Sequence, residues 1–156
     1  MKKLVVFYSR DGHTKKVAEK IYKLLKCDID EIVDKKDRSN MIGWIISGKD
    51  ASTKRLTEIE NKKDPSKYDL VIIGTPVWAF TMTPAIRTYL TKNKLNIKKC
   101  KLAFFCTFGG KESKSLSDME KLSKKPIISL GLNDKDIEKN SVELNLKIKK
   151  FCDKLK

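Results

Sequence analysis

The sequence predicts an α/β fold in which helices cover both faces of a five-stranded parallel sheet. Apolar segments of strand length alternate along the chain with segments in which apolar residues recur at helical spacing. The chain has 156 residues, of which 40% are hydrophobic, which is enough for one compact domain with its own core. We therefore expect residues 1–156 to form a single domain.

The first predicted strand and helix meet at a turn that is typical of phosphate-binding loops. Residues 3–8 are rich in β-branched and aromatic side chains, as expected of a strand buried on both faces. The next helix carries an apolar stripe of Val17, Ala18, Ile21, Tyr22, Leu24 and Leu25. The turn between them reads Ser9-Arg10-Asp11-Gly12-His13-Thr14, and its hydroxyls, glycine and helix N-terminus can hold a phosphate dianion. The alternative is an ordinary turn with a Thr N-cap.

The region from residue 28 to residue 63 is less regular. Residues 28–33 alternate polar and apolar, which indicates an edge strand. Within 35–63 we expect one short helix and then a loop at 57–60. Residues 43–50 match part of a Walker loop, but Asp50 replaces the magnesium-binding hydroxyl and no strand precedes them, which disfavours a nucleoside triphosphatase. Trp44, with Ile45 and Ile46, is interpreted as a helix face over the sheet, with a pocket wall or a subunit contact as the alternative.

The clearest strand, residues 69–74, follows a turn at 64–68 and should be central. A second loop comes after it and reads Thr75-Pro76-Val77-Trp78-Ala79-Phe80. Thr83 as N-cap and Pro84 as first helical residue then predict a helix, whose inner face is Ala85, Ile86, Tyr89 and Leu90. Because Trp78 and Phe80 lie between a central strand and a capped helix, we expect at least one of them to contact a ligand.

The last third of the chain supplies a third loop. A strand at 102–106 runs into Thr107-Phe108-Gly109-Gly110, whose paired glycines permit either close approach by a flat ligand or an unusual turn. A helix at 115–122, a strand at 126–130 and a helix at 134–155 capped by Asp134 complete the prediction. The last helix has one apolar stripe, Ile137, Leu144, Ile148, Phe151 and Leu155. In a sheet ordered 2-1-3-4-5, the three loops would surround one site.

The formal charge of +15, from 35 Lys and Arg against 20 Asp and Glu, raises the question of nucleic-acid binding. The lysines are spread along the chain and no reader motif is present, so we interpret them as a solvated surface and expect no nucleic-acid partner. Such a field favours acidic protein partners or an anionic cofactor.

Cysteine usage and hydropathy indicate a cytoplasmic protein. Cys27, Cys100, Cys106 and Cys152 are scattered without C-x-x-C pairing, which indicates neither a zinc site nor a disulfide framework. No segment reaches the apolar length of a bilayer span, and the N-terminus has no signal-peptide pattern. We therefore expect no membrane insertion.

The three loops resemble, in order and spacing over essentially the whole chain, those of the flavodoxin-like FMN-binding family. Ser9 to Thr14 is similar to the family's Thr/Ser-x-Thr-Gly-x-Thr phosphate loop, and residues 75–80 resemble the loop flanking the isoalloxazine ring. Residues 107–110 resemble the third loop. The resemblance implies a flavodoxin-like three-layer sandwich with a five-stranded parallel sheet in the order 2-1-3-4-5.

The resemblance also implies a set of cofactor contacts. It assigns the FMN phosphate to Ser9, Gly12 and Thr14 with nearby backbone N–H groups, the flavin ring to Trp78 or Phe80, and the polar ring edge to residues 107–110. His13, the sole histidine, is interpreted as part of the phosphate loop rather than as a proton-transfer group. The expected cofactor-binding residues are Ser9, Arg10, Asp11, Gly12, His13, Thr14, Thr75, Pro76, Val77, Trp78, Ala79, Phe80, Thr107, Phe108, Gly109 and Gly110.

The function implied by the resemblance is electron transfer by FMN, in one- or two-electron steps, between redox protein partners. The alternative is an NAD(P)H-dependent reductase acting on quinones or other small acceptors. No pattern typical of nucleophilic or acid–base catalysis is present, so no catalytic side chain is expected. This chain departs from the family pattern in two ways. Carriers of the family are typically acidic, whereas this chain is basic. The Arg-Asp-Gly version of the first loop also resembles that of flavodoxin-like protoporphyrinogen oxidases, but their long extra segment is not evident here. A flavin-free receiver domain is disfavoured, because Asp11 stands alone where an acidic cluster would be needed.

Overall fold

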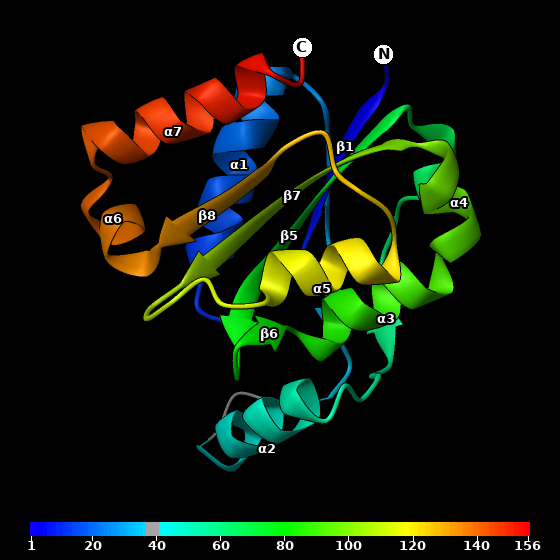
Figure 1. Ribbon diagram of the computed structural model, residues 1–156, viewed down its shortest axis with the longest axis vertical. Coiled ribbons are helices and arrows are strands. Elements are labelled where there is room, and N and C mark those ends of the chain that lie inside the picture. The colour runs from blue at the N-terminus through cyan, green and yellow to red at the C-terminus, as the bar shows by residue number, and fades with distance from the viewer. Residues whose placement is uncertain (37–40) are drawn as a thin grey trace.

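In the computed structural model, which describes residues 1–36 and 41–156, five parallel strands form the central sheet (Figure 1). They are β1 (Lys3–Phe7), β2 (Asp28–Glu31), β5 (Leu70–Trp78), β7 (Lys101–Phe108) and β8 (Ser129–Asn133). Their spatial order is β2-β1-β5-β7-β8. Counted along the chain this is 2-1-3-4-5, so the expected α/β sheet and its order are confirmed.

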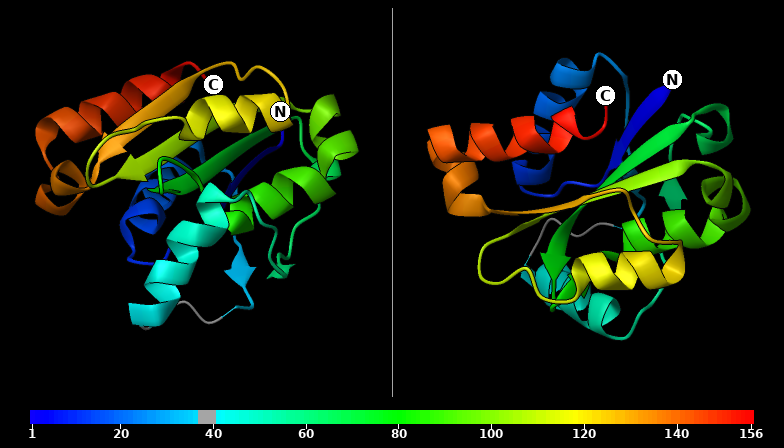
Figure 2. Two further views of the ribbon diagram at one scale, coloured as in Figure 1. Left: turned by 60° about the horizontal axis from the view of Figure 1, so that its bottom comes forward. Right: turned by 45° about the horizontal axis from the view of Figure 1, so that its top comes forward.

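Helices pack on both faces of the sheet and create two cores (Figures 1 and 2). One face is covered by α1 (His13–Leu25), α6 (Asp134–Lys139) and α7 (Val142–Asp153), and the other by α3 (Pro84–Lys92), α4 (Lys94–Lys99) and α5 (Ser115–Leu122). Alternate side chains of β1 point to opposite faces of the sheet, so one strand contributes to both cores. Leu4 and Val6 belong to one core, and Val5 and Phe7 belong to the other. Strands buried on both faces explain the continuous apolar runs in the sequence.

The central strand β5 extends further than predicted. Residues 75–78, expected to be loop, continue the strand, and a two-residue turn returns the chain into β6 (Thr81–Met82), which pairs antiparallel with it. Ala79 and Phe80 form the turn with φ of 44° and 65°. Hairpin turns with two positive φ values normally use Asn-Gly or Asp-Gly, so the sequence carries no usual signal for this hairpin.

The helix that follows this hairpin starts as expected. The Thr83 hydroxyl accepts a hydrogen bond from the Ile86 N–H at 3.5 Å, and Pro84 is the first helical residue. Its expected inner face, Ala85, Ile86, Tyr89 and Leu90, is fully buried.

The expected C-terminal helix is broken into α6 and α7. Asn140 adopts a left-handed conformation (φ 49°), and the Ser141 hydroxyl accepts a hydrogen bond from the Leu144 N–H to start α7. The apolar stripe remained continuous across the break, which is why the sequence pattern concealed it; all five of its residues are buried. Asn133, rather than Asp134, caps α6 by accepting from the Lys135 N–H.

Other boundaries differ in smaller ways. The fifth sheet strand lies at 129–133 rather than 126–130, and the expected loop at 57–60 contains β4 (Ile59–Glu60), which pairs with β3 (Val33–Asp34). The helix α4 and the 3-10 turn η1 (Pro65–Lys67) were not anticipated. In α1, Tyr22 and Leu24 are 39% and 47% exposed, so both leave the predicted stripe.

The helix α2 (Met41–Ser52) lies beyond the carboxyl ends of the strands instead of covering the sheet (Figure 1). It contacts β5, β6 and α3, and its Ile45 is 62% exposed. The Walker-like residues 43–50 are helical and make no phosphate loop. The side chain of Trp44, on which the predicted helix face depended, lies outside the described residues.

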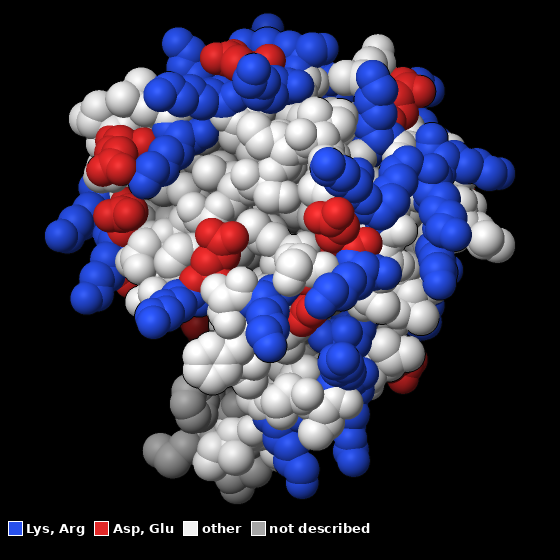
Figure 3. All heavy atoms as spheres, in the orientation of Figure 1, with Lys and Arg blue, Asp and Glu red and all other residues white. Residues whose placement is uncertain are grey.

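Lysine and arginine side chains are distributed over the visible face of the molecule, interspersed with acidic ones (Figure 3). Within the described part of the chain, no helix has the length and hydropathy to cross a bilayer.

Candidate functional site

A cavity of about 560 Å³ opens at the carboxyl ends of β1, β5 and β7, where all three predicted loops meet. Its volume is in the range of small-molecule and cofactor sites. The predicted residues that line it are Ser9, Arg10, Asp11, His13, Thr14, Pro76, Val77, Trp78, Ala79, Thr107 and Gly109. Gly12, Thr75, Phe80, Phe108 and Gly110 lie outside this lining.

The Ser9 hydroxyl organises the first loop. Its Oγ accepts hydrogen bonds from the N–H groups of Gly12 and Lys15, each at 3.2 Å, so Ser9 caps the start of α1 in place of the Thr considered from sequence. Gly12 is the N-cap residue and has φ 89°, a conformation that glycine adopts without strain. A hydroxyl that accepts two hydrogen bonds can still donate one. Because Ser9 lines the cavity, its hydroxyl is available to donate a hydrogen bond to an anion bound there.

A buried pair of hydroxyls joins the first loop to the third. Thr14 Oγ1 and Thr107 Oγ1 lie 2.8 Å apart, and both residues are almost fully buried. Thr75 has a different role, because its hydroxyl donates to the Pro76 carbonyl and accepts from the Thr83 N–H. Thr75 therefore holds the strand end to the start of α3, while Thr14 and Thr107 both line the cavity.

Trp78 supplies the aromatic wall. Tyr8 meets it edge-on with ring centroids 5.6 Å apart, and the guanidinium carbon of Arg10 lies 4.7 Å from the ring centroid. Two guanidinium nitrogens of Arg10 also donate to the Asp11 carboxylate at 3.1 and 3.3 Å. The indole thus contacts a second aromatic ring in T-shaped geometry and a flat cation, and both contacts are favourable for its π-system.

Phe80 points elsewhere. It is 70% exposed at the tip of the hairpin and lines a separate shallow groove with Lys54 and Lys114. Of the two aromatic residues singled out from sequence, Trp78 is therefore the one at the cavity.

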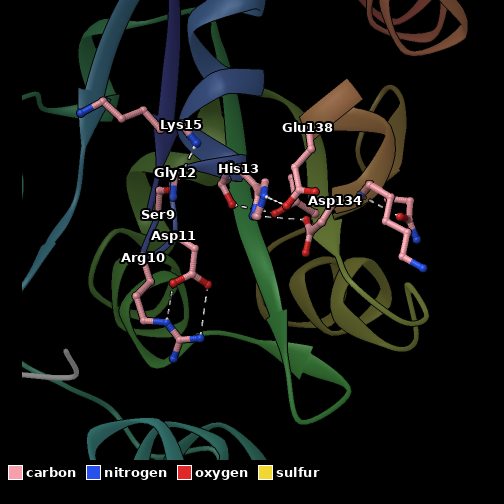
Figure 4. Close-up of polar contacts among 12 residues, drawn as sticks. Ser9, Arg10, Asp11, Gly12, His13, Lys15, Asp134 and Glu138 are labelled. Atoms are coloured by element: carbon pink, nitrogen blue, oxygen red, sulfur yellow. Dashed lines mark hydrogen bonds and ion pairs between the residues drawn. The ribbon is translucent and has the colours of Figure 1, made fainter. Parts of the chain in front are cut away.

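His13 lies between two carboxylates of α6 (Figure 4). Its Nε2 is 3.0 Å from Glu138 Oε1 and its Nδ1 is 3.9 Å from Asp134 Oδ1. Burial raises the pKa of Asp134 above its ordinary value; His13 opposes this shift, and Asp11 and Glu138 add to it. Asp134 lines the cavity, although the sequence indicated only a helix cap. Its position after the fifth strand, next to the third loop, was the available signal.

Four further lining residues come from α2: Ile45, Ser47, Gly48 and Lys49. Ser47 is buried and donates to the Gly43 carbonyl, as a hydroxyl inside a helix often does. Sequence reasoning missed these residues because nothing local fixes how a helix packs beyond the end of a sheet. Ile45 forms part of the pocket wall, which was one of the alternatives given for this segment from sequence.

A buried arginine contacts the second strand of the hairpin, β6. Arg87 of α3 is 5% exposed and donates to the Thr81 hydroxyl at 3.2 Å, while that hydroxyl donates to Asp118 of α5 at 2.7 Å. Burial lowers the pKa of Arg87, and Asp118 opposes this shift. The chain of contacts ties β6 to two helices and thereby fixes the turn that follows Trp78.

Comparisons with known proteins agree with this geometry. A family model described as flavodoxin matches residues 2–151. A flavoprotein from Lactobacillus acidophilus, solved in complex with FMN, is 26% identical, with 88% of this chain and 97% of that chain covered and a TM-score of 0.71.

Two further solved structures share the fold. A putative flavoprotein from Bacteroides eggerthii is 23% identical, covering 94% of this chain and 97% of its own, with a TM-score of 0.65. Two-electron reduced flavodoxin from Megasphaera elsdenii is 14% identical, covering 97% and 98%, with a TM-score of 0.61. Among curated proteins, no match was found.

Proposed function

The chain belongs to the flavodoxin family, and from this premise we propose that it binds FMN in the cavity and carries electrons between protein partners. The observation that carries the proposal is the meeting of three loops around one cavity, whose lining includes Ser9, Thr14, Thr107 and the aromatic residue Trp78. FMN supplies the redox chemistry when bound, since it exchanges one or two electrons.

The residues present suit the two parts of this cofactor. Ser9, Thr14 and the N-terminus of α1 would hold the phosphate with neutral donors. Trp78 would hold the flavin ring, and Arg10 must leave or share the indole face when the ring enters. Thr107 and Gly109 line the same cavity from the third loop, where the polar edge of the ring would lie.

The positive charge of the chain supports the choice of partner. A net charge of +15 attracts both an anionic cofactor and a protein with an acidic surface, and it speeds encounter at low salt. The free thiols Cys27, Cys100, Cys106 and Cys152 fit a reducing compartment, which supports the predicted cytoplasmic location.

Binding is tested by adding FMN to the purified protein, removing free cofactor by gel filtration and recording the visible spectrum. We expect flavin bands to remain with the protein at a one-to-one ratio, and riboflavin, which lacks the phosphate, to bind at least about tenfold more weakly. Equal binding of both flavins would show that the first loop does not hold the phosphate. A protein that retains neither would contradict the proposed function.

The same sample separates the two roles. Reduction by dithionite with no response to NADH or NADPH supports the electron carrier. Direct bleaching by NADH or NADPH assigns the chain instead to the reductases that pass electrons to quinones or other small acceptors.

A further inference from the structure

The imidazole of His13 is held so that its two nitrogens face different carboxylates (Figure 4). Glu138, one turn further along α6 than Asp134, lies at hydrogen-bond distance from Nε2, 3.0 Å. Asp134 Oδ1 faces Nδ1 from 3.9 Å, which is within ion-pair distance and beyond hydrogen-bond distance. The contact joins the start of α1 to α6 at the edge of the cavity.

This geometry fixes the tautomer of the neutral ring. An ionised carboxylate only accepts hydrogen bonds, so the nitrogen 3.0 Å from Glu138 must carry the hydrogen. A neutral imidazole has a single N–H, and Nδ1 therefore turns a lone pair toward Asp134 Oδ1. That oxygen is buried and has no hydrogen-bond partner in the described part of the chain, which is the expected result when two acceptors face each other.

Among residues 1–36 and 41–156, the other charged groups around His13 do not supply a hydrogen-bond donor to Asp134 Oδ1. In the first loop, Arg10 is bonded to Asp11, and in α1 the Lys15 ammonium bonds to Glu31. The third loop lines the cavity with Thr107 and Gly109, and both of these residues are uncharged. Beyond His13 itself, α6 and the first loop bring carboxylates toward Asp134, namely Glu138 and Asp11.

We propose that His13 takes up one proton from solvent at Nδ1 when a phosphate ester binds in the cavity. The new N–H faces Asp134 Oδ1 and gives that oxygen its donor, and the His13–Asp134 pair changes from a net charge of −1 to zero. The removed negative charge would otherwise oppose the incoming phosphate, because both residues line the same cavity. The identity of the ester as FMN rests on the proposed function; the proton uptake does not.

The coupling has a definite sign. The occupied site binds more protons than the empty one, so affinity for the phosphate ester falls as pH rises, by up to about tenfold per pH unit for one proton.

Because the chain has a single histidine, NMR can follow its imidazole without assignment. We expect the Nε2–H tautomer in the cofactor-free protein, and an imidazole that carries a hydrogen on both nitrogens when FMN saturates the site at the same pH. An Nδ1–H tautomer, or an imidazole that titrates identically with and without FMN, would overturn the proposal. Titration with inorganic phosphate repeats the test without any flavin.

Calorimetry in buffers of different ionisation enthalpy counts the protons directly. At pH 8, where free FMN phosphate is already a dianion, we expect the wild type to take up a substantial fraction of a proton and His13→Gln to take up almost none. Asp134→Asn should also lose the uptake and bind FMN more tightly at pH 8. Asp136→Asn is the matched control on the same helix, because Asp136 acts on Lys147 of α7.

The outcomes separate the two proposals. Uptake that persists in His13→Gln would place the proton on the phosphate and overturn the inference while leaving FMN binding intact. Failure to bind FMN would remove the proposed function, and the inorganic phosphate titration would then decide the inference: an imidazole that phosphate leaves unchanged overturns it.

Discussion

Two parts of the cavity wall are built differently. In the first and third loops, hydroxyls and backbone N–H groups bond to one another: Ser9 accepts from two N–H groups, and Thr14 meets Thr107. Around Trp78, the indole contacts an aromatic ring and a cation and is followed by a turn with two left-handed residues. The comparison teaches that directed hydrogen bonds fix the first part, whereas ring and cation contacts form the second.

We expect the largest loss of FMN affinity from a substitution at Gly12, in the first loop. A Cβ there meets no atom within 4 Å, so Gly12→Val has room, but its φ of 89° forces a β-branched residue into a strained conformation. The loop must shift to relieve about 1–2 kcal/mol of strain, and we expect FMN affinity, measured by quenching of flavin fluorescence, to fall at least about 100-fold.

Gly110→Val is the control for this change. Gly110 also has open space around its Cβ, does not have positive φ and lies outside the cavity lining. We expect Gly110→Val to bind like the wild type. Wild-type affinity in Gly12→Val would mean that the phosphate lies elsewhere.

The next effect separates the two aromatic residues. Trp78→Leu removes the ring that lines the cavity and should weaken FMN binding by about tenfold or more, since aromatic stacking contributes beyond the area it buries. Phe80→Leu changes an exposed side chain outside the cavity and should leave affinity within about twofold. The reverse ranking in the same fluorescence titration would show that the hairpin tip holds the flavin.

A smaller effect is expected on stability at the hairpin. Phe80 has φ 65°, a conformation that costs a non-glycine residue about 1–2 kcal/mol. Glycine avoids this cost in the folded state, but its greater freedom in the unfolded chain offsets part of the stabilisation. Urea denaturation should therefore show Phe80→Gly to be about 0.5–1 kcal/mol more stable than the wild type. Phe80→Leu keeps the constraint and should show no gain; an equal gain in both variants would trace it to the lost aromatic ring.

The smallest effect concerns Asp134 in the cofactor-free protein. Folding raises the pKa of its carboxyl above 3.8, so the folded state favours the protonated form. The contribution of this carboxyl to folding stability is therefore greatest below about pH 3.8, and it is lost as pH rises through the raised pKa of the folded state. Asp134→Asn should be more stable than the wild type at pH 7 by less than about 1 kcal/mol, and the difference should shrink at pH 4. A gain independent of pH would indicate packing rather than charge.

Most of the fold could be predicted because its signals are local. The runs at residues 3–7 and 70–73 are apolar because they are buried on both faces, and Thr83-Pro84 marks a helix start by its own chemistry. Strand order and the convergence of three loops then follow from the general geometry of parallel α/β sheets.

The remaining features depend on tertiary context. The break at Asn140 leaves the apolar stripe intact, and the turn at Ala79 and Phe80 uses residues that give no hairpin signal. Asp134 and Ile45 reach the cavity only because α6 and α2 pack where they do. Their roles could be found only from the folded structure.

The cation over Trp78 has a consequence for the newly made chain. A bare indole at the mouth of an empty cofactor site is an adhesive surface that invites aggregation. Arg10 covers that face with a hydrated, flat charge and is itself held by Asp11, its neighbour in sequence. Before its cofactor arrives, the protein thus covers its aromatic wall with its own side chains.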